Sequence, residues 1–390
     1  MPAISYRELR RRYELDGAEK TIHHLSEALE KKHLRPDDFS LRDLAESLIP
    51  EGRQWVKALD PRQSSPVSIM EAGDAVDVTA FLNVTGQIIY AQILETYRHE
   101  AFVASRLVRT IPTRLDGEKI PGTSGIPETM TEVLPGMPYP HVGFSERYVE
   151  TPSTTKHGLI VAVTREAIFF DRTHIVLRQA AEVGETLGRL KEKRILDVII
   201  GAVNTYRENG VAYNTYYAAG SGGPWVNVLA NNPLEDWTSV DRAEQLFSEM
   251  TDPLTGEPIL IRPNTVLVPS ALRHTARRVF HATAISFAPD GSATATTFAN
   301  PLSDYRVWDS QLLYQRIVAS GVSAEVAKTW WLIGDFARAF AYMENWPLTV
   351  TQSAPGSEAD FTQDIVVRFK ASERGTAAVL DPRYVVRCSG

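Results

Sequence analysis

Histidine is the residue type that would most readily hold a metal, and its spacing here points away from a metal centre. The sequence has nine histidines, and no His-Glu-x-x-His pattern or His/Cys set with zinc spacing occurs among them. His274 and His281 are seven positions apart and so share one face of a predicted helix. No carboxylate stands three or four positions from either to complete a ligand set. We therefore expect no metal site and no cofactor.

The other residue types that carry chemistry are equally isolated. No Gly-x-Ser-x-Gly pattern occurs, and Cys388 lies in a predicted strand without a catalytic signature around it. The glycine-rich run 220–223 is followed by Pro224-Trp225 rather than by Lys-Ser/Thr, so it indicates a loop and not a phosphate cradle. Asp252 and Glu257 supply too few oxygens for a calcium loop. These motifs therefore predict a protein that is not an enzyme.

Composition and charge narrow the class of protein further. The chain of 390 residues is 43% hydrophobic and 23% charged, which is typical of a folded globular protein. Its net charge of −7 disfavours adhesion of the whole surface to nucleic acid or to an anionic membrane. One cysteine excludes an internal disulfide framework. The start has no apolar core of a signal peptide, and no apolar run approaches the ~20 residues of a membrane span. We expect a soluble protein in a reducing compartment.

The first 60 residues differ from the rest, because 23 of them are charged. The spacing of Ile22, Leu25 and Leu29 predicts one helix over residues 13–33, and Ser40 provides a cap for a second helix over 41–48. One interpretation is a solvated helical hairpin, and the other is an arm that binds a partner. In either case we expect these residues mostly to make contacts rather than to form part of the hydrophobic core. Residues 60–68 have the composition of a linker.

The most unusual segment is 112–150, which follows a predicted strand over 103–112. It has 39 residues, with six prolines and five glycines, yet it also carries many apolar side chains. An irregular loop longer than about 15 residues is uncommon unless it is functional. We interpret the segment as an extended arm whose apolar side chains are buried on another subunit. The alternative is an ordered hairpin folded back on its own domain.

Helices and strands then occur in blocks, which favours an α+β fold over a doubly wound parallel sheet. The longest helical pattern is 173–201, which has apolar residues at intervals of three and four. Asn209-Gly210 predicts a hairpin within 206–217. A further helix is expected at 75–98, a polar loop at 286–300 and a short helix at 335–342. Strands are expected at 330–333, 348–351, 364–371, 376–380 and 384–387.

Taken in this order, the features resemble the major capsid protein of tailed phages, the Hong Kong ninety-seven-type fold that is shared with encapsulins. The order is a charged helical segment, a strand, a long arm rich in proline and glycine, a long helix, a compact α+β region and returning strands. The residues that carry the resemblance are the runs 116–121, 163–171, 334–336 with 339–342, and 369–375 with 379–383.

The resemblance implies six regions of the chain. They are an N-terminal arm at 1–69, an entry helix and strand of the P-domain at 70–111, an extended E-loop at 112–150, the P-domain with its spine helix at 151–224, an A-domain at 225–345 and C-terminal strands returning to the P-domain at 346–390. The implied function is a structural coat protein that assembles through pentamers and hexamers into an icosahedral shell around double-stranded DNA.

The same resemblance implies partners and a location. They are further copies of the chain, a scaffold, a portal, a maturation protease or a decoration protein, and packaged DNA bound without sequence specificity. The implied location is the virion capsid, assembled in the host cytoplasm. The residues expected to contact neighbouring subunits are Lys119, Ile120, Ile126, Val133, Leu134, Tyr139 and Arg147. Two alternatives are an encapsulin-type compartment and an enzyme that uses residues 286–300 as a lid.

Some members of the family join a lysine of the E-loop to an asparagine of a neighbour's P-domain. Lys119 would supply the amine in this chain, but residues 348–390 contain no asparagine. We therefore expect a shell without covalent cross-links, and Asn345 is the fallback acceptor.

Overall fold

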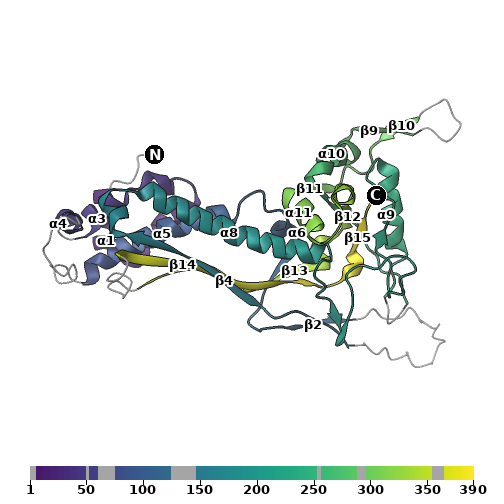
Figure 1. Cartoon of the computed structure of the whole chain (residues 1–390), viewed down its shortest axis with the longest axis horizontal. Helices are drawn as coiled ribbons and strands as arrows, with labels where there is room; N and C mark the ends of the chain where they lie inside the picture. The colour runs from purple at the N-terminus through teal and green to yellow at the C-terminus, as the bar shows by residue number, and fades with distance from the viewer. Residues whose placement is uncertain are drawn as a thin grey trace, which may run out of the picture. The chain divides into compact units, whose positions relative to one another are not determined.

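The structure is a computed structural model, and it describes residues 6–49, 52–59, 75–123, 146–252, 256–287, 296–353 and 364–390. Helices and strands are mixed along the chain, which confirms the α+β class expected from the sequence (Figure 1). The chain forms two compact units. The first contains Met1–His99, Lys156–Leu190 and Trp346–Arg374, and the second contains Glu100–Thr155, Lys191–Asn345 and Gly375–Gly390. Among the described helices, none is both long enough and apolar enough to cross a bilayer.

The first unit is a layer of helices packed on one face of a sheet. Its helices are α1 (Tyr6–Asp16), α2 (Ala18–Glu30), the short 3₁₀ helix η1 (Pro36–Asp38), α3 (Leu41–Leu48), α4 (Gly52–Ala58), α5 (Ala75–Tyr97), α7 (Arg165–Phe169) and the first part of α8 (Thr173–Ile199). Its strands are most of β4 (Thr155–Thr164) and parts of β13 (Phe340–Gln352) and β14 (Ile365–Val379). The sheet to which these strands belong has the order β1-β13-β14-β4.

The N-terminal helices belong to the core of this unit, so the expectation that they make contacts rather than core is wrong. Leu25 of α2 and Leu44 of α3 are buried in the same apolar cluster as Phe81 of α5, Val163 of β4 and Phe369 of β14. A solvated hairpin therefore does not describe them, and the interpretation as an arm that binds a partner stays a prediction. The charged composition misled the interpretation because each short helix has one apolar stripe beneath a charged outer face.

The single helix expected at 13–33 is two helices. Gly17 separates α1 from α2 with a φ of +81°, a left-handed conformation that glycine adopts without the steric cost of a Cβ. The helix expected at 41–48 is confirmed, and the Ser40 side chain caps it by accepting a hydrogen bond from the Asp43 N–H. The linker expected at 60–68 lies outside the described residues.

The second unit is organised around a five-stranded sheet with the order β11-β8-β12-β15-β7. These strands are β7 (Val228–Leu229), β8 (Thr265–Pro269), β11 (Arg306–Ser310), β12 (Trp331–Gly334) and β15 (Val385–Cys388). The helices of the unit are α6 (Ala104–Leu107), the last part of α8, α9 (Trp237–Ser248), η2 (Ser270–Leu272), α10 (Arg273–His281), α11 (Gln311–Ala319), α12 (Ala324–Ala327), α13 (Phe336–Ala339) and η3 (Pro382–Tyr384).

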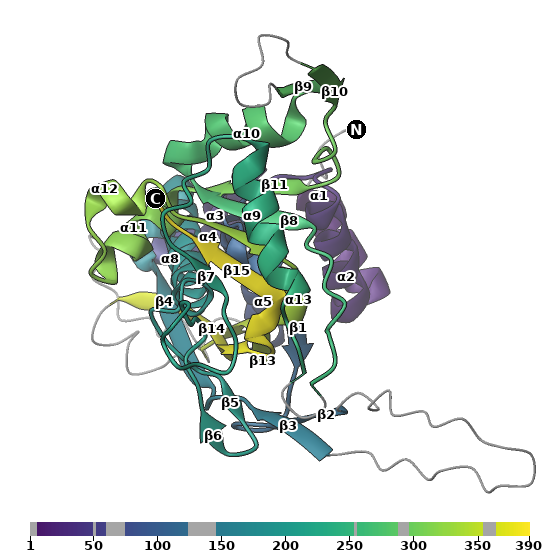
Figure 2. The ribbon, with the colours of Figure 1, turned by 90° about the vertical axis from the view of Figure 1, so that its right-hand side faces the viewer.

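Both faces of this sheet are buried, because the apolar side chains along its strands point alternately to one face and the other. Val266 and Val268 of β8 pack with α9 and α10, whereas Leu267 between them packs in the cluster that contains α11 and the end of α8. Successive side chains of a strand point to opposite faces, so helices cover both sides of the sheet. Figures 1 and 2 show α9 on one side of these strands and α11 on the other.

The remaining strands of the second unit form two smaller sheets, and one of them, β1, is the edge strand of the sheet that contains β13. They are β1 (Arg109–Pro112), β2 (Lys119–Thr123), β3 (Glu146–Glu150), β5 (Arg207–Glu208), β6 (Val211–Ala212), β9 (Ala284–Phe287) and β10 (Thr296–Ala299). Strand β1 runs parallel to the start of β13, and β2, β3, β5 and β6 make an antiparallel sheet in that order.

In the second unit, several helices and strands differ from those expected from the sequence. The strand expected at 103–112 begins as helix α6, because the Glu192 carboxylate accepts the N–H groups at its start. The loop expected at 286–300 contains parts of the antiparallel pair β9 and β10. The helix expected at 335–342 ends at Ala339, since residues from Phe340 onward pair as β13. The strands expected at 348–351, 364–371 and 376–380 are pieces of the longer β13 and β14.

Candidate assembly site

The segment expected to be an irregular arm has ordered strands at both ends. Strands β2 and β3 pair antiparallel, with Lys119 opposite Glu150 and Thr123 opposite Glu146. Residues 124–145 connect them and lie outside the described residues. The residues before β2 also bind the residues after β3, because Asp116 Oδ1 accepts hydrogen bonds from the Thr154 N–H at 2.7 Å and from the Thr154 hydroxyl at 2.9 Å. The 112–150 segment is therefore a connection held at its base.

A type I′-like turn extends this sheet by two short strands. Asn209 and Gly210 have φ values of +50° and +83°, as the Asn-Gly pair predicts for the hairpin of β5 and β6. The Asn209 side chain also accepts the Tyr148 N–H at 3.1 Å, and the Asn209 N–H donates to the Tyr148 carbonyl at 3.0 Å. The hairpin thus anchors β3 along its second edge.

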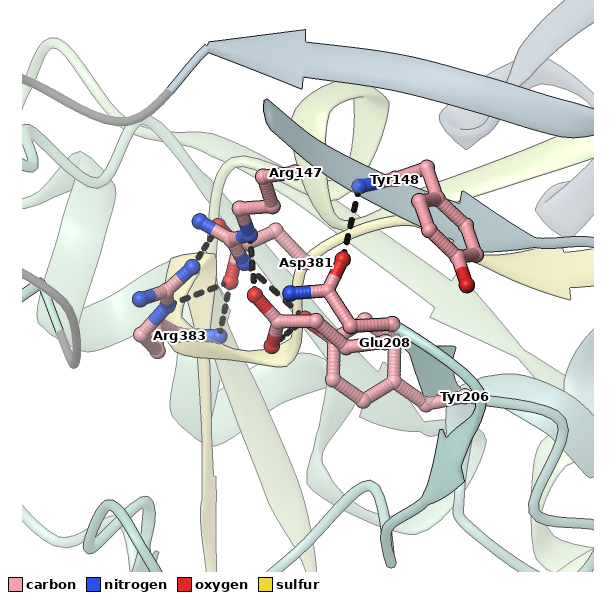
Figure 3. Close-up of polar contacts among 7 residues, drawn as sticks. Arg147, Tyr148, Tyr206, Glu208, Asp381 and Arg383 are labelled. Atoms are coloured by element: carbon pink, nitrogen blue, oxygen red, sulfur yellow. Dashed lines mark hydrogen bonds and ion pairs between the residues drawn. The ribbon is translucent and has the colours of Figure 1, made fainter. Parts of the chain in front are cut away.

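Beneath these strands lies an ionic cluster of five residues, which Figure 3 shows. Arg147 of β3 forms ion pairs with Glu208 of β5 and with Asp381, whose carboxylate lies 3.8 Å from the Arg147 guanidinium. Arg383 binds the Asp381 carboxylate through Nε at 2.8 Å and Nη2 at 2.7 Å. The Tyr206 hydroxyl accepts from Arg147 at 3.0 Å and donates to Glu208 at 2.8 Å.

The cluster is buried and its charges balance. The Arg147 side chain is 11% exposed and that of Arg383 is 1% exposed. Two guanidinium groups face two carboxylates, so no net charge is removed from water. Burial, together with the negative charge of Asp381, raises the pKa of Tyr206 and keeps its hydroxyl protonated as a donor. The arrangement is suited to holding β3 against the chain near the C-terminus.

The structure places the predicted contact residues in three different environments. The Lys119 side chain is 64% exposed, with its ammonium 3.5 Å from Glu150 and over the Tyr148 ring. Ile120 is half-buried against Ala341 and Met343 of its own chain. Arg147 belongs to the cluster just described. The other four, Ile126, Val133, Leu134 and Tyr139, lie outside the described residues.

The cluster partners of Arg147 were not predicted from the sequence. The Asn209-Gly210 pair located the hairpin, but nothing in the local sequence distinguishes Glu208 from other charged residues of predicted strands. Asp381 and Arg383 are more than 170 positions from Tyr206, and no local pattern indicates that pairing. The predicted fallback acceptor, Asn345, donates its side-chain amide to the Thr113 carbonyl at 3.2 Å. Among the described residues no group of three or more His, Cys, Asp or Glu side chains is placed to hold a metal ion.

Comparison with known proteins identifies the family. The profile described as phage capsid protein matches residues 148–388 of this chain. No curated protein sequence matches the chain.

Among solved structures, the capsid of a native GTA particle is 12% identical, with a TM-score of 0.45, over 75% of this chain and 90% of that one. The cyanophage Pam1 capsid is 13% identical, with a TM-score of 0.46, over 76% and 93%. A virus-like particle from Pyrococcus furiosus is 8% identical, with a TM-score of 0.40, over 77% and 97%. Since the family profile covers well over half of its length, the chain belongs to the phage capsid protein family and is a structural subunit of a capsid shell.

Proposed function

We propose that this chain is the major capsid protein of a tailed phage. It assembles through pentamers and hexamers into an icosahedral shell that encloses double-stranded DNA. The observation that carries this proposal is the family match over residues 148–388. Its net charge of −7 is compatible with a shell that does not adhere to the packaged nucleic acid.

The contact between subunits is made in part by the E-loop. The proposed contact groups are the exposed ammonium of Lys119, the residues Ile126, Val133, Leu134 and Tyr139 of the connecting segment, and Ile120 and Arg147 at its base. Support comes from the base itself, because β2, β3 and the ionic cluster hold both ends of the segment. A loop fixed at its base has lost part of its conformational freedom before it binds, which lowers the entropic cost of docking.

The regions of the family are assigned to the chain as part of the same proposal. Residues 1–69 form the N-terminal arm, 112–150 the E-loop and 225–345 the A-domain. Residues 70–111, 151–224 and 346–390 together form the proposed P-domain, although strand β15 at the end of this last range pairs with β12 and β7 in the sheet of the proposed A-domain. The length of α8 and of the strands β13 and β14 supports the P-domain assignment, because the resemblance implies a long spine helix and returning strands in that domain.

The proposal extends to partners and to location. The chain has no enzymatic role, and it is located in the virion capsid after assembly in the host cytoplasm. A scaffold, a portal, a maturation protease or a decoration protein would act on or bind to the same shell. An encapsulin-type compartment is the alternative, and it differs in having no genome inside.

The experiment is expression of the chain followed by size-exclusion chromatography and negative-stain electron microscopy. We expect capsomers or closed particles of megadalton mass. A small oligomer of fixed size with no particles would contradict a shell protein. Mass spectrometry of purified virions, with analysis of their nucleic acid, separates the alternatives, because an encapsulin-type shell would not be found around a phage genome.

A further inference from the structure

Helix α10 presents an unusually basic surface. It buries Ala276, Val279 and Phe280, and its exposed side chains include the five residues that we name the α10 basic surface: Arg273, His274, Arg277, Arg278 and His281. No acidic residue occurs within the helix. Arg273 pairs with Asp309 at 3.4 Å. In the part of the chain that the structure describes, neither Arg277 nor Arg278 has a carboxylate partner, and Arg278 donates to the Glu235 carbonyl at 3.5 Å.

Helix α9 and the residues at its ends carry the opposite charge. Four exposed carboxylates form what we name the α9 acidic surface: Glu235, Asp236, Asp241 and Glu249. A fifth carboxylate, Glu244, is half-buried and accepts the Tyr305 hydroxyl. Arg242 is the single basic residue between positions 235 and 249.

Both helices lie on the same face of the five-stranded sheet. Val240 and Phe247 of α9 and Val279 and Phe280 of α10 share one buried cluster with Val266 and Val268 of β8. Figure 2 shows α10 running across the second unit with α9 beside it. One layer of the unit therefore exposes a basic and an acidic surface together.

This juxtaposition favours another copy of the chain as the partner. A heterologous contact joins two different surfaces of the same protein, so each copy must carry both complementary halves. Opposite charges on two neighbouring helices meet that requirement. A DNA duplex lying on α10 would instead approach the carboxylates of α9, which repel its phosphates.

We propose that the α10 basic surface of one copy docks against the α9 acidic surface of the next copy, in a head-to-tail contact. The inference rests on the proposed self-assembly of the chain. It assigns to Arg277 and Arg278 a partner, Asp241 and Glu249 of a neighbouring copy, that no contact among the described residues of one chain supplies.

The test is a charge swap measured by chromatography and electron microscopy at low and high salt. Arg277→Glu with Arg278→Glu on α10 should lower the amount of assembled protein by about tenfold or more. Asp241→Arg with Glu249→Arg on α9 should do the same. The chain with all four changes should assemble again, because every contact then pairs the reversed charges. Reversal of two exposed basic residues elsewhere in the unit, Arg262→Glu with Lys328→Glu, is the matched control and should assemble like the wild type.

Circular dichroism establishes that each variant is folded, and the milder Arg277→Gln with Arg278→Gln provides a second measurement if a reversal fails to fold. Assembly of the α10 variant at the wild-type level overturns the inference. The inference is also overturned if the variant with all four substitutions fails to assemble and the wild-type protein binds labelled duplex DNA through α10 in a salt-sensitive manner. Failure of the unaltered chain to assemble at all contradicts the proposed function and this inference together, and it is recognised before any variant is compared.

Discussion

Glu192 illustrates how one side chain determines local structure at a distance. Its side chain has no exposed surface, and its carboxylate accepts N–H groups from Val103 at 2.8 Å, Ala104 at 2.6 Å and Ser105 at 3.0 Å. Those donors belong to the first turn of α6 and have no partner within the helix. Glu192 therefore caps a helix that lies about ninety positions earlier in the chain.

Replacing Glu192 with alanine should lower the free energy of unfolding by about 2 kcal/mol or more, because three buried N–H groups lose their acceptor. Urea unfolding followed by circular dichroism measures the loss. Glu182→Ala is the matched control on the same helix, since that carboxylate is 69% exposed and should change stability by less than about 0.5 kcal/mol. Equal effects of the two changes would show that the cap contributes nothing.

Glu192 also predicts a pH dependence. Burial raises its pKa above the ordinary 4.5, although the backbone donors at Ala104, Ser105 and Val103 oppose the shift. The folded state then binds the proton more tightly than the unfolded chain does. This contribution to stability is complete below the unfolded pKa and is lost as pH rises through the folded pKa. The stability difference between wild type and Glu192→Ala should accordingly shrink from acid toward neutral pH, and a difference that grows would contradict the direction.

Arg147 is the second residue whose removal should be costly. Arg147→Met leaves Glu208, which is 8% exposed, without its guanidinium partner, and breaking a buried pair in this way costs about 3–5 kcal/mol. Arg207→Met is the control on the neighbouring strand, because Arg207 is 56% exposed beside Glu150 and such pairs contribute about 1 kcal/mol or less. Chemical denaturation of both variants compares them. A loss for Arg147→Met no larger than for Arg207→Met would mean that the cluster does not anchor β3.

At the scale of elements, the close approach of α8 to α5 depends on Gly184. A Cβ at this position would lie 2.2 Å from Thr96 Oγ1 and 2.3 Å from the Ile93 carbonyl oxygen. Gly184→Val should therefore destabilise the protein by about 1–3 kcal/mol through overpacking. The exposed Thr186→Val on the same helix should be close to neutral, and thermal unfolding of both variants gives the comparison. Tolerance of valine at 184 would refute this packing.

The register of β2 and β3 permits a clean test of the E-loop. Thr123 faces Glu146, so replacing residues 124–145 by Asn-Gly would close the two strands with a two-residue turn. We expect a folded subunit with an unchanged thermal transition that no longer forms particles, because the deleted residues include the proposed contacts with neighbouring subunits. Substituting a flexible Gly/Ser segment of equal length separates loss of contact residues from loss of length. Normal particles from the Asn-Gly variant would exclude an intersubunit role.

At the scale of the whole particle, we expect no covalent cross-links. The Lys119 ammonium is close to Glu150 of its own chain, and the Asn345 amide donates to Thr113. Particles boiled in SDS with a reductant should give one band near the chain mass of 43.4 kDa. A ladder of multimers, lost in Lys119→Arg, would instead identify Lys119 as the cross-linking amine.

The sequence by itself determined what depends on neighbouring residues. Periodicity located α5 and α8, Ser40 located the start of α3, and Asn209-Gly210 located the β5–β6 hairpin, because caps, turns and apolar stripes are set within a few positions. The order of such segments was enough to indicate the capsid family, which the profile match confirms.

Tertiary structure alone decided which distant residues meet. Glu192 turns part of an apparent strand into α6, Asp381 and Arg383 complete the cluster of Arg147, and the charged N-terminal helices bury Leu25 and Leu44 in the core of the first unit. Each result depends on contacts between segments separated by tens to hundreds of positions. Local propensity is a weak preference that such burial and pairing override, so no window of sequence could reveal them.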